Sequence, residues 1–228
     1  MSQELIIELV EAGVHFGHQR QKWDPRMKPY LLEERNKIHL LDIQQTVGQL
    51  ESASRFLAKL MREGKKVLFV GCKRQAQDAV QQAAEETSQY FVNHRWLGGT
   101  LTNLETIRKS VKRLAYLEDI EKSPDFKKMG KKELASLNRE RAKLFRNLAG
   151  IRLMEKAPDA LVIVDSARES IAVAEARKKN IPIVALVDSN ANPDIIDFPI
   201  AANDDAIRSI RTILRKLVES MIDAGGGR

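Results

Sequence analysis

Four aspartates stand where an enzyme built on parallel strands would keep its acids. Asp165 and Asp188 directly follow apolar runs, and Asp194 and Asp197 lie in the loop after the second run. Carboxylates at the carboxyl ends of parallel strands could act as general acids or bases. The same residues also cap helices and form turns, and Asn192-Pro193 before Asp194 is a turn sequence. We favour capping and turn chemistry for this set.

The other groups with covalent or metal chemistry lack the partners that such chemistry needs. Cys72, the single cysteine, stands beside Lys73 and Arg74 at the expected start of a helix, but no base and orienting group accompany it. His15 and His18 are three residues apart, and no second Cys or His pair follows to complete a zinc site. We expect a structural thiol, no catalytic residue and no bound metal.

The sequence carries neither of the common nucleotide-binding fingerprints. The turn GCKRQA at residues 71–76 has one glycine where a dinucleotide fingerprint needs three, and no Walker A sequence occurs. The segment LGGTLTN at residues 97–103 could present backbone N–H groups to a phosphate at a helix start. An enzyme with a phosphate ligand, using Gly98-Gly99 and Asp188, is therefore the alternative to a binding protein, and we expect no cofactor and no small-molecule substrate.

Positive charge concentrated between residues 106 and 156 is the strongest chemical signal. This stretch holds 15 Lys or Arg and 7 Asp or Glu, a net charge of +8 within a chain whose total is +7. Clustered cations bind polyanions because they displace counterions from phosphates. The cations are Arg108, Lys109, Lys112 and Arg113, then Lys127, Lys128, Lys131 and Lys132, then Arg139, Arg141, Lys143 and Arg146. An exposed helix pair laced by ion pairs, such as Glu140 with Lys143, is the competing interpretation.

A second basic segment, residues 15–37, interleaves cations with aromatic side chains. Six Lys or Arg and three acids surround Trp23 and Tyr30. Such a pattern could grip phosphates and stack on bases, or the aromatics could cover the flank of a domain while the cations are solvated. These two interpretations are evenly matched. Residues 188–205 have the opposite sign, with five Asp and no Lys or Arg, so this loop should face away from phosphates, or hold a cation or a partner's arginines.

The apolar pattern predicts the scaffold that positions these groups. Short apolar runs alternate with amphipathic stretches, which implies a doubly wound parallel sheet of the α/β class. Strands are expected at 38–41, 67–70, 90–92, 160–164, 183–187 and 198–200, and helices at 4–12, 44–62, 75–87, 169–179 and 204–223. Two further helices, about 101–121 and 132–156, should pair as an antiparallel coiled-coil hairpin.

These elements suggest four regions. They are an N-terminal helix and basic aromatic arm at 1–37, a Rossmann-like α/β core at 38–100 and 157–223, a hairpin insertion at 101–156, and a flexible tail at 224–228. The 228 residues, 43% of them hydrophobic, can bury a sizeable core. One cysteine excludes an intrachain disulfide, no apolar run approaches the roughly 20 residues that cross a bilayer, and the N-terminus is unlike a signal peptide. We expect a cytoplasmic protein without a membrane partner.

Several long motifs, in the same order, resemble small ribosomal subunit protein 2 of the bacterial type. They are EAGVHFGHQRQKWDPRMKPYLLEERNKIHLLD at 11–42, FVGCKRQAQ at 69–77, FVNHRWLGGTLTN at 91–103, PDALVIVD at 158–165, EARKKNIPIVALVDSNANPD at 175–194 and NDDAIRSI at 203–210. The resemblance implies a non-enzymatic ribosomal component that binds small-subunit rRNA near the junction of head and body. It also implies contacts with neighbouring small-subunit proteins and help in docking the large mRNA-binding ribosomal protein 1.

The positions that are constant in that family match eight residues here, which are His18, Arg20, Trp23, Arg26, Lys28, Asn93, Arg95 and Trp96. With the basic residues around them and in the hairpin, the predicted rRNA-binding set is His18, Arg20, Lys22, Trp23, Arg26, Lys28, Lys73, Arg74, Asn93, Arg95, Arg108, Lys109, Lys112, Arg113, Lys127, Lys128, Lys131, Lys132, Arg139 and Arg141. Cys72 stands where many members have Thr, and Ala191 where many have Cys. No role based on a thiol is therefore carried over.

Overall fold

The computed structural model describes residues 3–122 and 130–225 of the chain. The helices are α1 Gln3–Glu11, α2 Ile43–Arg62, α3 Gln77–Glu86, α4 Leu104–Lys122, α5 Lys131–Leu148, α6 Ser170–Lys178 and α7 Ile207–Ala224. The strands are β1 Phe16–Gln19, β2 Leu31–Arg35, β3 Ile38–Leu41, β4 Val67–Val70, β5 Tyr90–Val92, β6 Ala160–Val164, β7 Ile183–Val187 and β8 Phe198–Ala201. In the described residues no helix is both long and apolar enough to span a bilayer.

A five-stranded parallel sheet forms the body, with strand order β5-β4-β6-β7-β8. Its two faces are covered by different helices. Val67 and Phe69 of β4 belong to an apolar cluster with residues of α2, α3 and α7, whereas Leu68 and Val70 belong to one with residues of α6 and the base of α4. Because both faces are covered, every residue of β4, β6 and β7 is buried. The predicted Rossmann-like α/β fold is confirmed.

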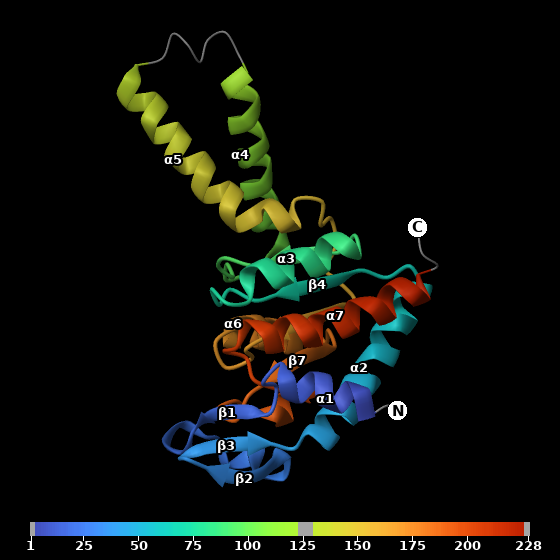
Figure 1. Ribbon diagram of the computed structural model, residues 1–228. Coiled ribbons are helices and arrows are strands. Elements are labelled where there is room, and N and C mark those ends of the chain that lie inside the picture. The colour runs from blue at the N-terminus through green and yellow to red at the C-terminus, as the bar shows by residue number, and fades with distance from the viewer. Residues whose placement is uncertain (1–2, 123–129, 226–228) are drawn as a thin grey trace.

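A separate three-stranded antiparallel sheet, of order β1-β3-β2, lies beside the body (Figure 1). We expected the strand 38–41 in the core and no strands at 15–37, and both expectations were wrong. Strands β2 and β3 pair up to Arg35 and Ile38, with Asn36 and Lys37 between them at φ 53° and 63°. Two successive residues with positive φ make the tight turn of a hairpin, and asparagine tolerates that conformation well. Asn36 was therefore the residue in the sequence that could have indicated this hairpin.

Three helices begin or end at residues that differ from the predicted bounds, and a specific contact accounts for the difference. The predicted helix 132–156 ends at Leu148 and is followed by a 3-10 turn, Ala149–Ile151. There Gly150 lies so close to β5 that a Cβ atom would stand 2.2 Å from the carbonyl oxygen of Phe91. The last helix begins at Ile207 rather than 204, because the Asn203 side chain caps the preceding N–H groups. Helix α4 begins at Leu104, after a hydrogen-bonded turn.

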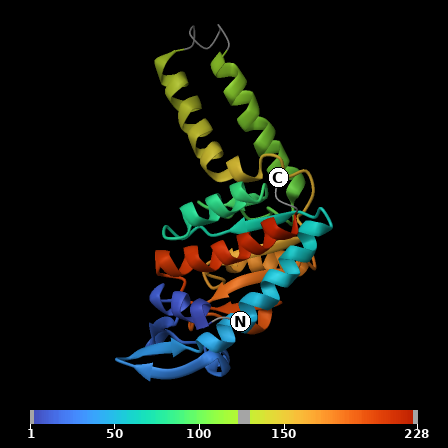
Figure 2. The same ribbon diagram turned by 45° about the vertical axis from the view of Figure 1, so that its right-hand side comes forward.

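Helices α4 and α5 form an antiparallel pair that projects from one end of the body (Figures 1 and 2). Burial along this pair is uneven. On α4, Ile107, Leu114 and Leu117 are buried. On α5, Leu148 at the base is buried, whereas Leu134 and Leu137 nearer the free end are only half-buried. Coiled-coil packing along the whole pair therefore remains a prediction. We call α4 and α5 together the hairpin.

Candidate nucleic-acid interface

Seven cations of the hairpin are exposed and have no ion-pair partner among the described residues. They are Arg108 and Lys112 on α4 and Lys131, Lys132, Arg139, Lys143 and Arg146 on α5. Unpaired ammonium and guanidinium groups on two exposed helices can neutralise a phosphate backbone without first breaking internal contacts. Five of the seven, Arg108, Lys112, Lys131, Lys132 and Arg139, belong to the predicted rRNA-binding set, and their contact with RNA remains a prediction.

Three further cations of the hairpin, Lys109, Arg113 and Arg141, have partners. Lys109 pairs with Glu105 at 3.2 Å. The guanidinium of Arg113 donates two hydrogen bonds to Glu140, 3.0 and 2.9 Å long, across the two helices. Glu140 thus bridges to α4 rather than to Lys143, the partner considered from the sequence. Arg141 is half-buried and also has a partner. Lys127 and Lys128 lie outside the described residues.

The aromatic residues of the N-terminal segment cover the body rather than stand free. The Trp23 ring is half-buried and lies against His39, with ring centroids 5.3 Å apart, and Tyr30 packs against the second apolar cluster. This placement supports the flank-covering interpretation over base stacking. The cations of the segment are exposed. Arg20 lies 3.6 Å from Glu34 and Arg26 pairs with Asp24, whereas Lys22 and Lys28 form no ion pair with a described residue.

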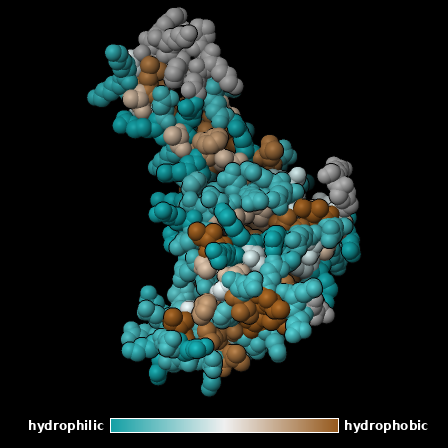
Figure 3. Space-filling view, in the orientation of Figure 1, coloured by the Kyte–Doolittle hydropathy of each residue, from teal (hydrophilic) through white to brown (hydrophobic). Residues whose placement is uncertain are grey.

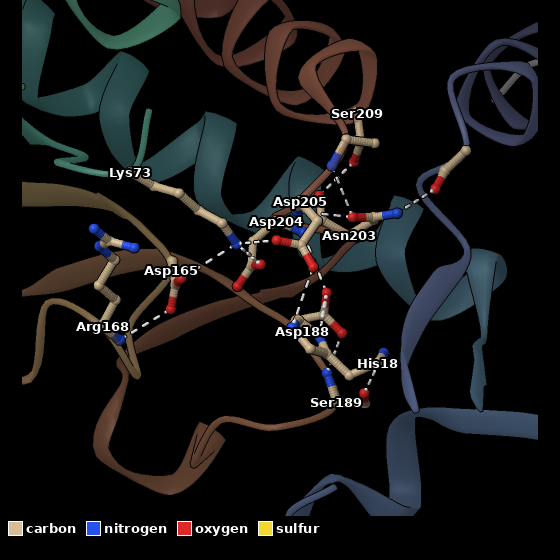
Figure 4. Close-up of polar contacts among 12 residues, drawn as sticks. His18, Lys73, Asp165, Arg168, Asp188, Ser189, Asn203, Asp204, Asp205 and Ser209 are labelled. Atoms are coloured by element: carbon tan, nitrogen blue, oxygen red, sulfur yellow. Dashed lines mark hydrogen bonds and ion pairs between the residues drawn. The ribbon is translucent and has the colours of Figure 1, made fainter. Parts of the chain in front are cut away.

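Lys73 differs from the exposed phosphate contact expected for it. The side chain is buried, and its Nζ lies 2.6 Å from Asp204, 2.5 Å from Asp205 and 3.3 Å from Asp165. Figure 4 shows it pointing into these carboxylates at the carboxyl edge of the sheet. Burial alone would lower the pKa of Lys73, but its hydrogen bonds to Asp204 and Asp205 outweigh burial and raise that pKa. Its charge is therefore balanced inside the protein.

His18 joins the same cluster from β1. Its Nδ1 lies 3.1 Å from Asp188 and its Nε2 lies 3.2 Å from Asp205, and the hydrogen bond to Asp188 raises the pKa of the imidazole. Burial raises the pKa of Asp204 to about 7. An acid-rich cluster that contains both Lys73 and His18 is a poor place for a phosphate, so His18 also differs from the predicted contact.

One nitrogen of His18 and one oxygen each of Asp188 and Asp204 lie within 4.8 Å of one another. A single imidazole with two carboxylates is a donor set that suits a divalent transition metal. The sequence suggested the acidic loop 188–205 as a possible holder of a cation, but it gave no reason to join His18 to Asp188 and Asp204, because the two aspartates follow more than 150 residues later. The donor set could hold a metal, and the expectation of no bound metal remains untested.

The backbone N–H groups of the glycine-rich turn are satisfied from within the protein. Glu175, which α6 contributes, accepts hydrogen bonds from the N–H groups of Gly99, Leu101 and Thr102 at 2.7, 3.0 and 3.0 Å. A carboxylate thus stands where the sequence suggested that a phosphate could bind. The arrangement counts against the alternative of an enzyme with a phosphate ligand at this turn.

Asn93 is buried too, and its side-chain amide donates to the Gln77 carbonyl and to Gln81. By contrast, Arg74 and Arg95 are exposed on the loops that follow β4 and β5. Sequence reasoning missed Arg168, which is exposed on the loop after β6 and follows the apolar run 160–164 by four residues. These three guanidinium groups belong to loops at the same edge, because parallel strands end together.

The candidate acids and the thiol have structural surroundings. Asp165 accepts the N–H of Arg168, Asp194 follows a capping Asn192, and Asp197 accepts the N–H of Ile183. The local contacts of Asp165 and Asp194 agree with the capping and turn chemistry that we favoured, whereas Asp197 bonds to a distant strand and Asp188 belongs to the cluster with His18. Burial raises the pKa of Cys72 to about 12, so the thiol stays protonated near neutral pH.

Comparison with known families identifies a match along most of the chain. The model of the family described as ribosomal protein S2 matches residues 9–224, which include the parallel sheet, the hairpin and most of the N-terminal segment.

Proposed function

Because this chain belongs to the ribosomal protein S2 family, whose members are structural proteins of the small ribosomal subunit and not enzymes, we propose that it anchors to small-subunit rRNA through the free cations of the hairpin. In bacteria the small subunit is cytoplasmic, and we assign the protein to that compartment.

The observation that carries the proposal is the set of exposed and unpaired cations on α4 and α5. Each such cation that meets a phosphate releases a counterion, so the binding constant falls steeply as salt rises. If all seven engage duplex RNA, the slope of log K against log salt is expected to be on the order of −6. Contacts of this kind position a protein on RNA and read no sequence.

Residues outside the hairpin supply a second group of contacts. Lys22 and Lys28 on the N-terminal segment and Arg74 and Arg95 at the sheet edge are exposed and suit phosphate binding. Arg20 and Arg26 are exposed beside a carboxylate each and contribute less. Lys127 and Lys128 belong to the proposed set on their sequence position alone.

Docking of neighbouring proteins, including ribosomal protein 1, is proposed for a different face. Ile7 and Val10 on α1, Phe16 on β1 and Leu32 on β2 are exposed apolar side chains. Figure 3 shows hydrophobic surface gathered over α1. Exposed apolar surface on a protein that works within an assembly commonly marks protein contact.

A competition assay for subunit assembly tests the rRNA anchor. Subunits that lack this protein are offered equal amounts of wild type and a variant with Arg108→Glu, Lys112→Glu, Arg139→Glu and Lys143→Glu, and then sedimented through sucrose. The variant is expected to be largely excluded from the small subunit. A control with Lys178→Glu, Lys179→Glu, Arg208→Glu and Arg211→Glu carries the same change in charge on exposed body residues and should compete far better. Equal incorporation of hairpin variant and wild type would refute the proposal.

A further inference from the structure

Glu175 is a buried carboxylate that one short turn surrounds with hydrogen-bond donors. Its Oε1 accepts from the indole Nε1 of Trp96 at 3.1 Å and from the Gly99 N–H at 2.7 Å. Its Oε2 accepts from the N–H groups of Leu101 and Thr102 and from the Thr102 hydroxyl, each at 3.0 Å. The residue is 8% exposed. Five donors from one stretch of chain leave this carboxylate little freedom to move.

That turn is the segment from which the hairpin starts. Gly99 has φ +92°, which favours glycine, and its carbonyl accepts the N–H of Asn103 at 2.7 Å. The Thr100 hydroxyl donates to the Leu97 carbonyl at 2.6 Å. Helix α4 begins at Leu104, two residues after the last donor to Glu175. The direction in which α4 leaves the body therefore depends on how this turn is held.

The other leg of the hairpin makes its polar and close backbone contacts with the edge strand β5. After α5, Gly150 packs on the Phe91 carbonyl of β5, and the Tyr90 hydroxyl donates to the Leu153 carbonyl at 3.2 Å. Helix α6, which carries Glu175, packs under the sheet in the second apolar cluster through Ala172, Val173 and Ala176. Glu175 thus ties the start of α4 to a helix embedded in the body, beyond the edge strand.

We propose that Glu175 is the positioning residue that sets the direction of the hairpin relative to the body, so that its free cations meet rRNA in one arrangement. The inference rests on the proposed rRNA anchor. It follows from geometry: a single carboxylate supplies both acceptor atoms for five donors of the turn, and no neutral side chain of similar size offers two acceptor oxygens. With Gln in its place, one of the two acceptors becomes an N–H donor and faces the donors of the turn.

Distance measurements by pulsed electron paramagnetic resonance test this directly. Spin labels are placed at Ala135→Cys on α5 and Gln82→Cys on α3, both exposed positions, with Cys72→Ala in the background. In the protein with Glu175, the distance between the two labels should have one narrow distribution. In the Glu175→Gln variant, that distribution should be broader or displaced. Asp197→Asn is the control, because it also removes a carboxylate that accepts a backbone N–H. Asp197 directly precedes β8, at the edge of the sheet opposite to β5. The control should leave the distribution unchanged.

Binding of the full chain to transcribed small-subunit rRNA supplies the functional readout. Glu175→Gln should weaken binding roughly tenfold in moderate salt, because misplaced cations lose phosphate contacts. In the background of the four hairpin charge reversals, Glu175→Gln should have no further effect, whereas general destabilisation would weaken binding in both backgrounds. An unchanged distance distribution or a loss in both backgrounds would overturn the role of Glu175. If the charge reversals themselves leave binding intact, the rRNA anchor fails instead.

Discussion

Lys73 and Asp204 form a buried ion pair across 131 positions of the chain, with Nζ and Oδ1 2.6 Å apart. The lysine follows β4, and the aspartate precedes α7, so the pair ties the first helix crossover of the sheet to the C-terminal helix. Around it stand Asp165 and Asp205, and His18 reaches Asp205 from the small sheet. The charge cluster therefore joins the parallel body to the N-terminal segment.

Replacing Lys73 by Met should destabilise the protein severely. The substitution leaves several carboxylates close together without their cation, and breaking a buried pair in this way costs about 3–5 kcal/mol. Urea unfolding of the pure protein measures the free energy of unfolding. Lys59→Met on α2 is the control, since Lys59 is exposed and lies 3.9 Å from Glu63; its cost should stay below about 1 kcal/mol. Similar losses for both variants would show that the cluster does not stabilise the fold.

Glu175 should make stability depend on pH. Burial raises the pKa of this carboxyl, but hydrogen bonds from Gly99, Thr102, Trp96 and Leu101 outweigh burial and hold the pKa below its ordinary value of 4.5. A carboxyl whose pKa is lower in the folded state stabilises the protein above pH 4.5, and this contribution disappears as pH falls through the folded-state pKa. The difference in unfolding free energy between wild type and Glu175→Gln should therefore shrink below pH 4.5. A constant difference from pH 7 to pH 3 would contradict the account.

Glu140→Gln should affect RNA binding more than stability. The pair with Arg113 is exposed, so its loss should cost less than about 1 kcal/mol in urea unfolding. The same change frees the Arg113 guanidinium for a phosphate, which should tighten rRNA binding and make the slope of log K against log salt steeper by about 1. Glu133→Gln is the control, because Glu133 is exposed in the first turn of α5 and pairs with no described cation. Weaker binding after Glu140→Gln would mean that the pair orders the hairpin for RNA.

Two glycine-to-alanine substitutions should change the stability of the protein in opposite directions. Gly150→Ala places a Cβ 2.2 Å from the Phe91 carbonyl oxygen, so the base of the hairpin must shift away from β5 at a cost of about 1–3 kcal/mol. Gly48→Ala lies within α2 with nothing inside 4 Å of the new Cβ, and alanine in a helix is favoured over glycine by roughly 0.5–1 kcal/mol. Thermal unfolding compares both with wild type. If Gly150→Ala stabilised the protein, the 3-10 turn Ala149–Ile151 would not be in close contact with the edge strand β5.

Local pattern in the sequence determined the body and the charge of the hairpin. The runs at 67–70, 160–164 and 183–187 coincide with β4, β6 and β7, because strands covered on both faces need uninterrupted apolar residues. The excess of Lys and Arg at 106–156 likewise predicted two exposed basic helices, because a period of 3.6 residues separates a buried stripe from a solvated one.

Only the tertiary structure decided which of the polar residues outside the hairpin face solvent. We expected Lys73, His18 and Asn93 to be exposed contacts, yet Lys73 and Asn93 are buried and His18 is half-buried. Each meets a partner that is distant in the sequence: Asp204 for Lys73, Asp188 for His18 and Gln81 for Asn93. Glu175 shows the same limit, since its donors lie 73 to 79 positions away. A polar residue buries its charge only where a distant partner meets it, and that meeting depends on strand order rather than on neighbouring residues.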